Sequence, residues 1–283
     1  MNQDLIDLDI AEVPLQEDVP SPEKGLSKAA AAPSELARRL DQCAILLDID
    51  GTLLDLAPTP REVWVPPGLA KTLNGLLDKT AGALALVSGR SLNDIDLIFA
   101  PEQYPAVGGH GAEMRVAADS EAVATHAPPM DKELKRRLAA IAKLSPGILL
   151  EDKGYSLALH YRLAPHAEKA IYAAVSLIRA DLPNAPIEVL PGKCVCEIKH
   201  SGFNKATGVL ELMSHEPFRG RCPIFIGDDV TDETVFAILP DLGGLAFSVG
   251  RRATGVADHF DEPRDVREWL ARLLRNEKAA VRP

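Results

Sequence analysis

A short apolar run ends in an acidic turn at residues 45–54, which read Ile45-Leu46-Leu47-Asp48-Ile49-Asp50-Gly51-Thr52-Leu53-Leu54. Because the run is apolar without alternation and stops at a turn, it predicts a parallel strand buried on both faces. In open α/β sheets the ligand site lies just beyond the carboxyl ends of such strands. Asp48 and Asp50 are two positions apart, so extended backbone directs both carboxylates to the same side. An ordinary strand followed by an Asp-Gly turn is the alternative, but Asp-x-Asp-Gly-Thr is much rarer and indicates chemistry.

Bulk properties restrict the class of protein. The chain has 283 residues, is 46% apolar and carries a net charge of −10, which suits one large domain or two modest ones with a sizeable core. The acidic balance argues against a nucleic-acid surface. No apolar stretch is long enough to span a membrane, and the acidic start does not resemble an export signal. The four cysteines form no Cys-x-x-Cys pair, and we expect them to be free thiols in a reducing compartment. We therefore expect a cytoplasmic protein.

The chain changes character after its first 35 residues. Residues 1–35 are rich in acids and prolines, which predicts a mobile tail. Beyond them strand-like and helical stretches alternate, which predicts βαβ units and a mostly parallel sheet. The expected strands are Ala44–Leu47, Ala83–Val87, Pro223–Ile226 and Gly244–Val249, and the expected helices are Leu69–Lys79, Leu92–Phe99, Lys205–Ser214 and Thr231–Leu239.

One interval, from Arg90 to Lys205, is several times longer than a single crossover. We expect it to contain helices at Lys132–Leu144 and Ala167–Ala180 and strands at Ile148–Glu151, Ser156–Tyr161, Ile187–Leu190 and Cys194–Lys199. Such a unit predicts a second, smaller domain at residues 116–199, inserted into a sheet domain made of residues 36–115 and 200–283.

Other strand and helix ends also carry polar groups. Ser88-Gly89-Arg90-Ser91 follows an apolar run, and its hydroxyl and helix start can face an oxyanion. Lys205 opens a helix whose start is already positive, which indicates a nearby anion or carboxylates unless the lysine is simply solvated.

A third apolar strand ends in four acids within Gly227-Asp228-Asp229-Val230-Thr231-Asp232-Glu233, more than a helix cap uses. If this strand lies beside that of Asp48, each unscreened pair of carboxylates about 4 Å apart costs about 4 kcal/mol at an effective dielectric near 20. The cluster therefore requires a cation, and an all-oxygen ligand set favours Mg²⁺ over Zn²⁺.

The order of these four motifs resembles the haloacid dehalogenase-like phosphatase superfamily. The resemblance implies a doubly wound, mostly parallel α/β core of the Rossmann type, an inserted α/β cap domain of the larger C2 type, Mg²⁺ and an aspartyl-phosphate intermediate. Further segments are similar to the trehalose-6-phosphate phosphatase family, namely Ser88–Ser91, Gly109-His110-Gly111-Ala112-Glu113, Glu151–Gly154, His160–Arg162, Gly192–Lys199 and Gly227–Glu233.

That family resemblance implies hydrolysis of trehalose 6-phosphate, a small sugar phosphate, in trehalose biosynthesis. It places Glu151, Lys153 and Glu197 of the cap on the sugar hydroxyls and Arg90 on the substrate. His110 is either a turn residue or a residue of the cleft.

The groups present suggest a mechanism built on two aspartates. Asp48 is expected to attack phosphorus, and Asp50 to protonate the leaving oxygen and later activate water. Mg²⁺ would bridge Asp48, the main-chain carbonyl of Asp50 and Asp228.

Further groups would support that centre. Asp229 and Asp232 are expected to stand behind the metal ligands. Ser88, Lys205 and Thr52 would hold the phosphoryl oxygens.

The sequence is also compatible with other functions. A different sugar phosphatase, such as one for sucrose 6-phosphate, has the same core motifs. A non-catalytic sugar-phosphate sensor would also use an aspartate beside Mg²⁺, but would not need Asp50. A phosphomutase is not excluded, and the sequence makes no prediction of oligomeric state.

Overall fold

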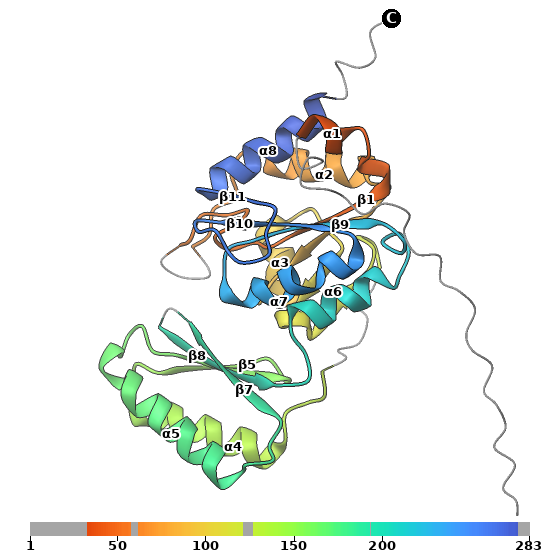
Figure 1. Ribbon diagram of the computed structural model, residues 1–283. Helices are drawn as coiled ribbons and strands as arrows, with labels where there is room; N and C mark the ends of the chain where they lie inside the picture. Colours follow the sequence, from red (N-terminus) through yellow and green to blue (C-terminus); the bar gives the residue numbers. More distant parts are fainter. Residues whose placement is uncertain (1–32, 58–61, 121–126, 193, 277–283) are drawn as a thin grey trace, which may run out of the picture.

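The computed structural model describes residues 33–57, 62–120, 127–192 and 194–276. The expected acidic tail falls mainly on residues 1–32, which lie outside the described residues, and helix α1 (Pro33–Ala37) opens the described part. Two separate sheets organise the rest of the chain (Figure 1).

The larger sheet has seven strands. Their order is β11 (Asp258–Phe260), β10 (Leu245–Val249), β9 (Cys222–Gly227), β1 (Cys43–Leu47), β2 (Leu84–Val87), β3 (Ala106–Gly108) and β4 (Glu113–Arg115). Each neighbouring pair is parallel except β3 with β4, so the expectation of a mostly parallel sheet is confirmed.

Helices cover both faces of this sheet, because its central strands are apolar on both sides. Along β1, Ile45 and Leu47 pack on one side, whereas Ala44 and Leu46 pack on the other. The first face is covered by α1, α2 (Leu69–Lys79), α3 (Leu92–Phe99) and α8 (Pro263–Asn276), and the second by α6 (Lys205–Met213) and α7 (Val230–Ile238). The result is the expected doubly wound α/β layer structure.

The smaller sheet is antiparallel, in the order β5 (Leu149–Asp152), β6 (Ser156–His160), β8 (Val195–His200) and β7 (Ile187–Gly192). Helices α4 (Lys132–Ala140) and α5 (Glu168–Asp181) pack on one of its faces, and the other face is turned toward the larger sheet's body (Figure 1). We propose that residues 116–199 form an inserted domain and that residues 36–115 and 200–283 form the main one, because each sheet has its own apolar core.

Strand order places the functional edge of the larger sheet. From β1 the chain runs to β2 and β3 on one side, and it later returns to β9 on the other. The carboxyl ends of β1 and β9 therefore meet at a topological switch point, where α/β sheets bind ligands. The amide of Asp48 donates to the Ile226 carbonyl at 2.9 Å, so the two strand ends stay in register up to this edge. Among the described helices, none combines the length and apolar character needed to cross a bilayer.

Truncating the fully buried Leu73 of α2 to alanine should lower the free energy of unfolding by about 2–5 kcal/mol, because it removes apolar contacts and leaves a cavity. Leu97→Ala in α3 is the matched control: its side chain is 70% exposed, so the change should stay within about 0.5 kcal/mol. Urea unfolding followed by tryptophan fluorescence measures both, and equal losses in the two variants would contradict the assigned core.

Candidate active site

A buried lysine stands at the centre of the edge formed by β1 and β9. Lys205 is the first residue of α6, a helix capped by Asn204, and its ammonium lies 2.7 Å from Asp48 Oδ1 and 2.7 Å from Asp232 Oδ1. All three side chains are buried. The sequence left open whether Lys205 is solvated or lies beside carboxylates, and the structure agrees with the second alternative.

Asp228 joins this group from the end of β9. One carboxylate oxygen from each of Asp48, Asp228 and Asp232 lies within 4.8 Å of the others. Gly51, at φ 81°, makes room for the cluster, since a Cβ there would lie 2.1 Å from Asp228 Oδ2. Thr52 is fully buried and donates to Asp228 Oδ1 at 3.4 Å, so its side chain contacts the acidic cluster.

The ionisation of these groups reflects crowding of negative charge. Burial raises the pKa of Asp48, although Lys205 opposes the shift. Burial and the nearby Asp232 raise the pKa of Asp228 to about 6. Burial would lower the pKa of Lys205, but Asp232 and Asp48 hold it above its ordinary value. One ammonium thus faces three carboxylates, and a further cation would favour the ionised form of all three.

The donor set fits a hard divalent cation such as Mg²⁺, which prefers carboxylate and carbonyl oxygens. Asp232 is already engaged, because its Oδ1 binds Lys205 and its Oδ2 accepts from the Asp229 amide at 3.0 Å. Asp229 caps α7, with its side chain accepting from the Val230 amide at 2.7 Å. Asp48 and Asp228 are therefore the better candidates for a metal, with Asp229 and Asp232 behind them.

Asp50 makes a contact that the sequence did not predict. Arg90 Nε donates to Asp50 Oδ2 at 2.5 Å, and Arg90 Nη2 donates to Oδ1 at 2.6 Å. Arg90, which the sequence predicted to bind the substrate, thus binds Asp50, which was predicted to act as both acid and base. Ser88, at the end of β2, is buried, and its hydroxyl accepts from the Arg90 amide at 3.2 Å.

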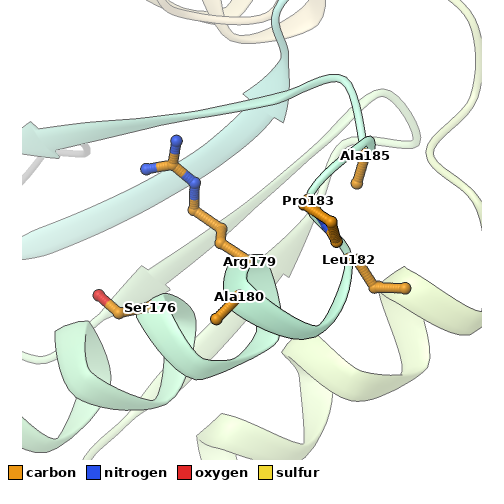
Figure 2. Close-up of a pocket in the computed structure, with 6 residues that line it drawn as sticks. All are labelled: Ser176, Arg179, Ala180, Leu182, Pro183 and Ala185. Atoms are coloured by element: carbon orange, nitrogen blue, oxygen red, sulfur yellow. The ribbon is translucent and has the colours of Figure 1, made fainter.

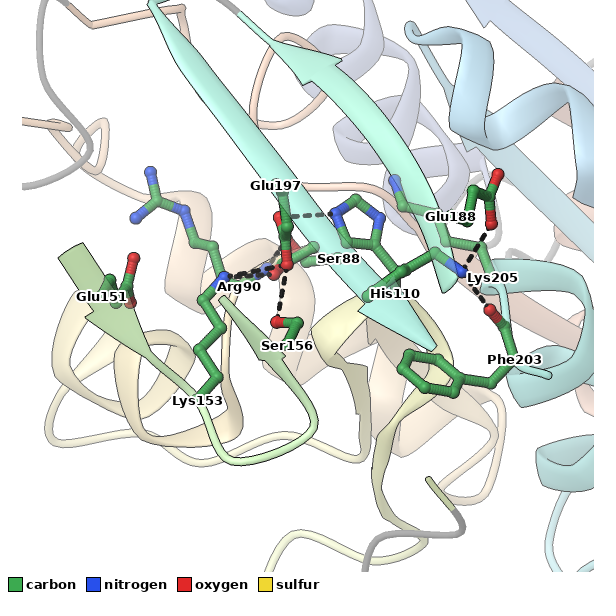
Figure 3. A network of polar contacts seen from close by, with 12 residues as sticks. Ser88, Arg90, His110, Glu151, Lys153, Ser156, Glu188, Glu197, Phe203 and Lys205 are labelled. Carbon is green, nitrogen blue, oxygen red and sulfur yellow. Dashed lines mark hydrogen bonds and ion pairs between the residues drawn. The ribbon is translucent and has the colours of Figure 1, made fainter. Parts of the chain in front are cut away.

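Glu197 of β8 contacts residues of both the cap and the main body (Figure 3). It accepts from the Ser156 hydroxyl at 2.9 Å, and Lys153 Nζ and His110 Nε2 each lie 3.6 Å from its carboxylate oxygens. Burial would raise the pKa of Glu197, but His110 and Lys153 lower it to about 2. Lys153 Nζ also lies 3.5 Å from the Gly89 carbonyl, so this lysine of the cap contacts the loop that carries Ser88.

Glu151 stands apart from that pair. Its Oε2 lies 2.9 Å from His160 Nε2 on the neighbouring strand, and this hydrogen bond lowers the pKa of Glu151 although burial opposes the shift. Glu151 therefore lies on the same open sheet face as Glu197, bound to a histidine of its own sheet. The structure brings Lys153 and Glu197 together and leaves Glu151 beside His160.

His110 is a turn residue whose ring faces Glu197 of the cap. Its backbone is left-handed at φ 56°, between two glycines that also have positive φ. Its ring packs on Gly89, where a Cβ would lie 2.4 Å from Nε2, and faces Glu197. The Gly-His-Gly pattern was the available signal, but it could not say which way the ring points.

A cavity of about 320 Å³ lies elsewhere, at the end of α5 in the helix layer of the cap (Figure 2). Its described lining is Ser176, Arg179, Ala180, Leu182, Pro183 and Ala185, with no predicted site residue among them. It plays no part in the candidate site.

The mostly parallel core, the acid cluster at its switch point and the inserted α/β unit define a haloacid dehalogenase-like phosphatase with a cap. The family model described as trehalose-phosphatase matches residues 46–263, and the chain belongs to that family.

Named relatives agree with this assignment. A probable trehalose-phosphate phosphatase of Sinorhizobium fredii is 43% identical over 77% of this chain and 81% of its own. The trehalose-6-phosphate phosphatase of Escherichia coli is 37% identical over 80% and 85%. The C-terminal domain of the C. albicans trehalose-6-phosphate phosphatase matches with a TM-score of 0.73 at 22% identity, over 89% of this chain and 98% of that one, which shows a shared fold.

Saturating MgCl₂ should raise the melting temperature by roughly 5 °C, because a ligand that binds only the folded state stabilises it. Asp228→Asn removes one of the two main candidate ligands and should reduce the shift to within about 1 °C. Differential scanning fluorimetry, with EDTA to reverse the effect, measures this. Asp241→Asn, at an exposed aspartate, is the control and should keep the full shift. A full shift in Asp228→Asn would contradict the metal assignment.

Proposed function

We propose that this protein is a Mg²⁺-dependent phosphatase that hydrolyses trehalose 6-phosphate to trehalose and phosphate. The observation that carries the proposal is Asp48, held against Lys205 at a strand end with Asp50 two residues further on. Membership of the trehalose-phosphatase family supports the substrate, as do the names of the bacterial relatives.

In the first half-reaction a carboxylate oxygen of Asp48 forms a bond to phosphorus as the bond from phosphorus to the sugar oxygen breaks. Asp50 gives its proton to the departing sugar oxygen, so neutral trehalose leaves. Lys205 holds its positive charge beside Asp48, where negative charge is densest, and the Ser88 hydroxyl lies at the neighbouring strand end to bind a phosphoryl oxygen.

In the second half-reaction Asp50 takes a proton from water, and that water attacks phosphorus and releases Asp48. Arg90 donates two hydrogen bonds to the Asp50 carboxyl group and so fixes its position at the strand end. Bound Mg²⁺, held by Asp48, Asp228 and the Asp50 carbonyl, would supply charge neutralisation for the phosphoryl group.

The cap has a separate task, which is to recognise the sugar. Lys153 and Glu197 bring opposite charges to one point on the open sheet face, and together they offer donors and acceptors to hydroxyl groups. Glu151 lies on the same face and adds a further acceptor. A cytoplasmic location remains part of the proposal and rests on composition.

Asp50→Asn should lower kcat for trehalose 6-phosphate by about 10²–10⁴-fold, because asparagine neither donates nor accepts the transferred proton. Asp55→Asn is the control, since Asp55 is an exposed residue of the same turn region paired with Arg267 at 3.4 Å, and it should keep wild-type turnover. Phosphate release measures both variants. Full activity in Asp50→Asn would refute the acid and base assignment and favour a different chemistry.

Glu197→Gln should lower kcat/KM for trehalose 6-phosphate by about 10–100-fold, because hydrogen bonds to charged groups contribute about 1.5–3 kcal/mol. Hydrolysis of p-nitrophenyl phosphate, which has no sugar, should change much less. Glu133→Gln in α4 is the control, because Glu133 is exposed and pairs with Arg136 on the helix layer.

The wild-type enzyme should prefer trehalose 6-phosphate over glucose 6-phosphate and sucrose 6-phosphate. The opposite preference would contradict the proposed substrate.

A further inference from the structure

A small apolar cluster joins the two sheets where the chain passes between them. Its buried members are Ala112, Ala127, Tyr155 and Phe203, here called the hinge cluster. Ala112 belongs to the main body, Ala127 and Phe203 to the two connecting segments, and Tyr155 to the turn that precedes β6 of the cap. One cluster thus contacts the core, the cap and both connections.

Tyr155 is the polar member of this cluster. Its ring meets Phe203 edge to face, with centroids 5.9 Å apart. Its hydroxyl donates to Glu113 Oε1 at 2.8 Å, across the boundary between cap and core. Gly109 lies directly beneath, since a Cβ there would be 2.2 Å from the tyrosine oxygen. The phenol therefore fits a site in the core that only a glycine leaves open.

Glu113 passes this contact on to the phosphate-binding loop. Its second oxygen, Oε2, accepts from the Leu92 amide at 2.6 Å, at the start of α3. Leu92 follows the Ser88–Ser91 turn, and the Arg90 carbonyl accepts from the Gly109 amide at 2.7 Å. A displacement of Tyr155 would therefore act, through one carboxylate, on the turn that carries Ser88 and Arg90.

Phe203 extends the same network to the catalytic lysine. It precedes Lys205 by two residues, and its carbonyl accepts a hydrogen bond from the buried Lys199 of β8. Lys153 lies two residues before Tyr155 in the turn between β5 and β6, whose Gly154 carbonyl accepts from the Met130 amide at 3.1 Å. The lysine proposed to bind the sugar and Tyr155 thus lie on one hairpin turn, which is held by this hydrogen bond.

We propose that Tyr155 is a positioning residue, which couples the cap to the phosphate-binding turn through its hydrogen bond to Glu113. The inference rests on the proposed phosphatase function and adds to it a residue that touches neither phosphate nor metal. Substrates that engage the cap depend on this coupling, whereas a phosphate ester without a sugar does not.

Tyr155→Phe tests the coupling, because it removes one oxygen and keeps the ring in the hinge cluster. We expect kcat/KM for trehalose 6-phosphate to fall about tenfold, and that for p-nitrophenyl phosphate to stay within about twofold. Tyr161→Phe is the matched control: its hydroxyl donates to Glu168 Oε1 at 2.9 Å within the cap, so both substrates should be hydrolysed as by wild type. Glu113→Gln should lower both activities, because it also weakens the Leu92 contact.

Two outcomes would overturn the inference. If Tyr155→Phe behaves like Tyr161→Phe, the hydrogen bond does not couple the domains. If it lowers both activities by one factor, Tyr155 has only a structural role. A wild-type enzyme that hydrolyses p-nitrophenyl phosphate but not trehalose 6-phosphate would instead contradict the proposed function, and the comparison would be repeated with the sugar phosphate that it accepts.

Discussion

The ion pairs of the buried Lys205 are the interaction on which the active centre depends. Burying an ammonium costs several kcal/mol unless charged partners surround it, and Lys205 has Asp48 and Asp232 at 2.7 Å each. These partners come from the end of β1 and from α7, so one side chain joins three segments of the main body. The same contacts that make its burial tolerable also reduce repulsion between the acids and hold Asp48, the proposed nucleophile, in place.

Under the proposed function, the residues for the chemistry and those for sugar recognition lie on different sheets. The groups proposed to react stand at strand ends and helix starts around a sheet buried on both faces, where packing restricts their movement. The groups proposed to bind the sugar stand on the open face of the cap sheet. His110, Lys153 and Glu197 meet between the two, so residues proposed to recognise the substrate also join the cap to the main body.

Much of the fold could be predicted because its central strands and helices have strong patterns. The continuous apolar runs of β1, β2 and β9 and the apolar spacing of α2 and α3 located these elements closely. The three-residue strands β3, β4 and β11 were missed, since so short a stretch carries no periodicity. Helix α8 was not predicted either, although Val266, Leu270 and Leu273 bury one side of it.

For the site, the sequence by itself determined which chemical groups stand at the strand ends. Asp48, Ser88 and Asp228 each follow an apolar run, so each must lie at the carboxyl end of its strand. Tertiary structure alone decided their partners. Arg90 binds Asp50, Thr52 contacts Asp228, and His110 faces Glu197. These partners are far apart in the chain, and their meeting depends on strand order, on the approach of the cap and on side-chain direction. Local residue patterns encode none of these, because they arise only when the separate elements pack together.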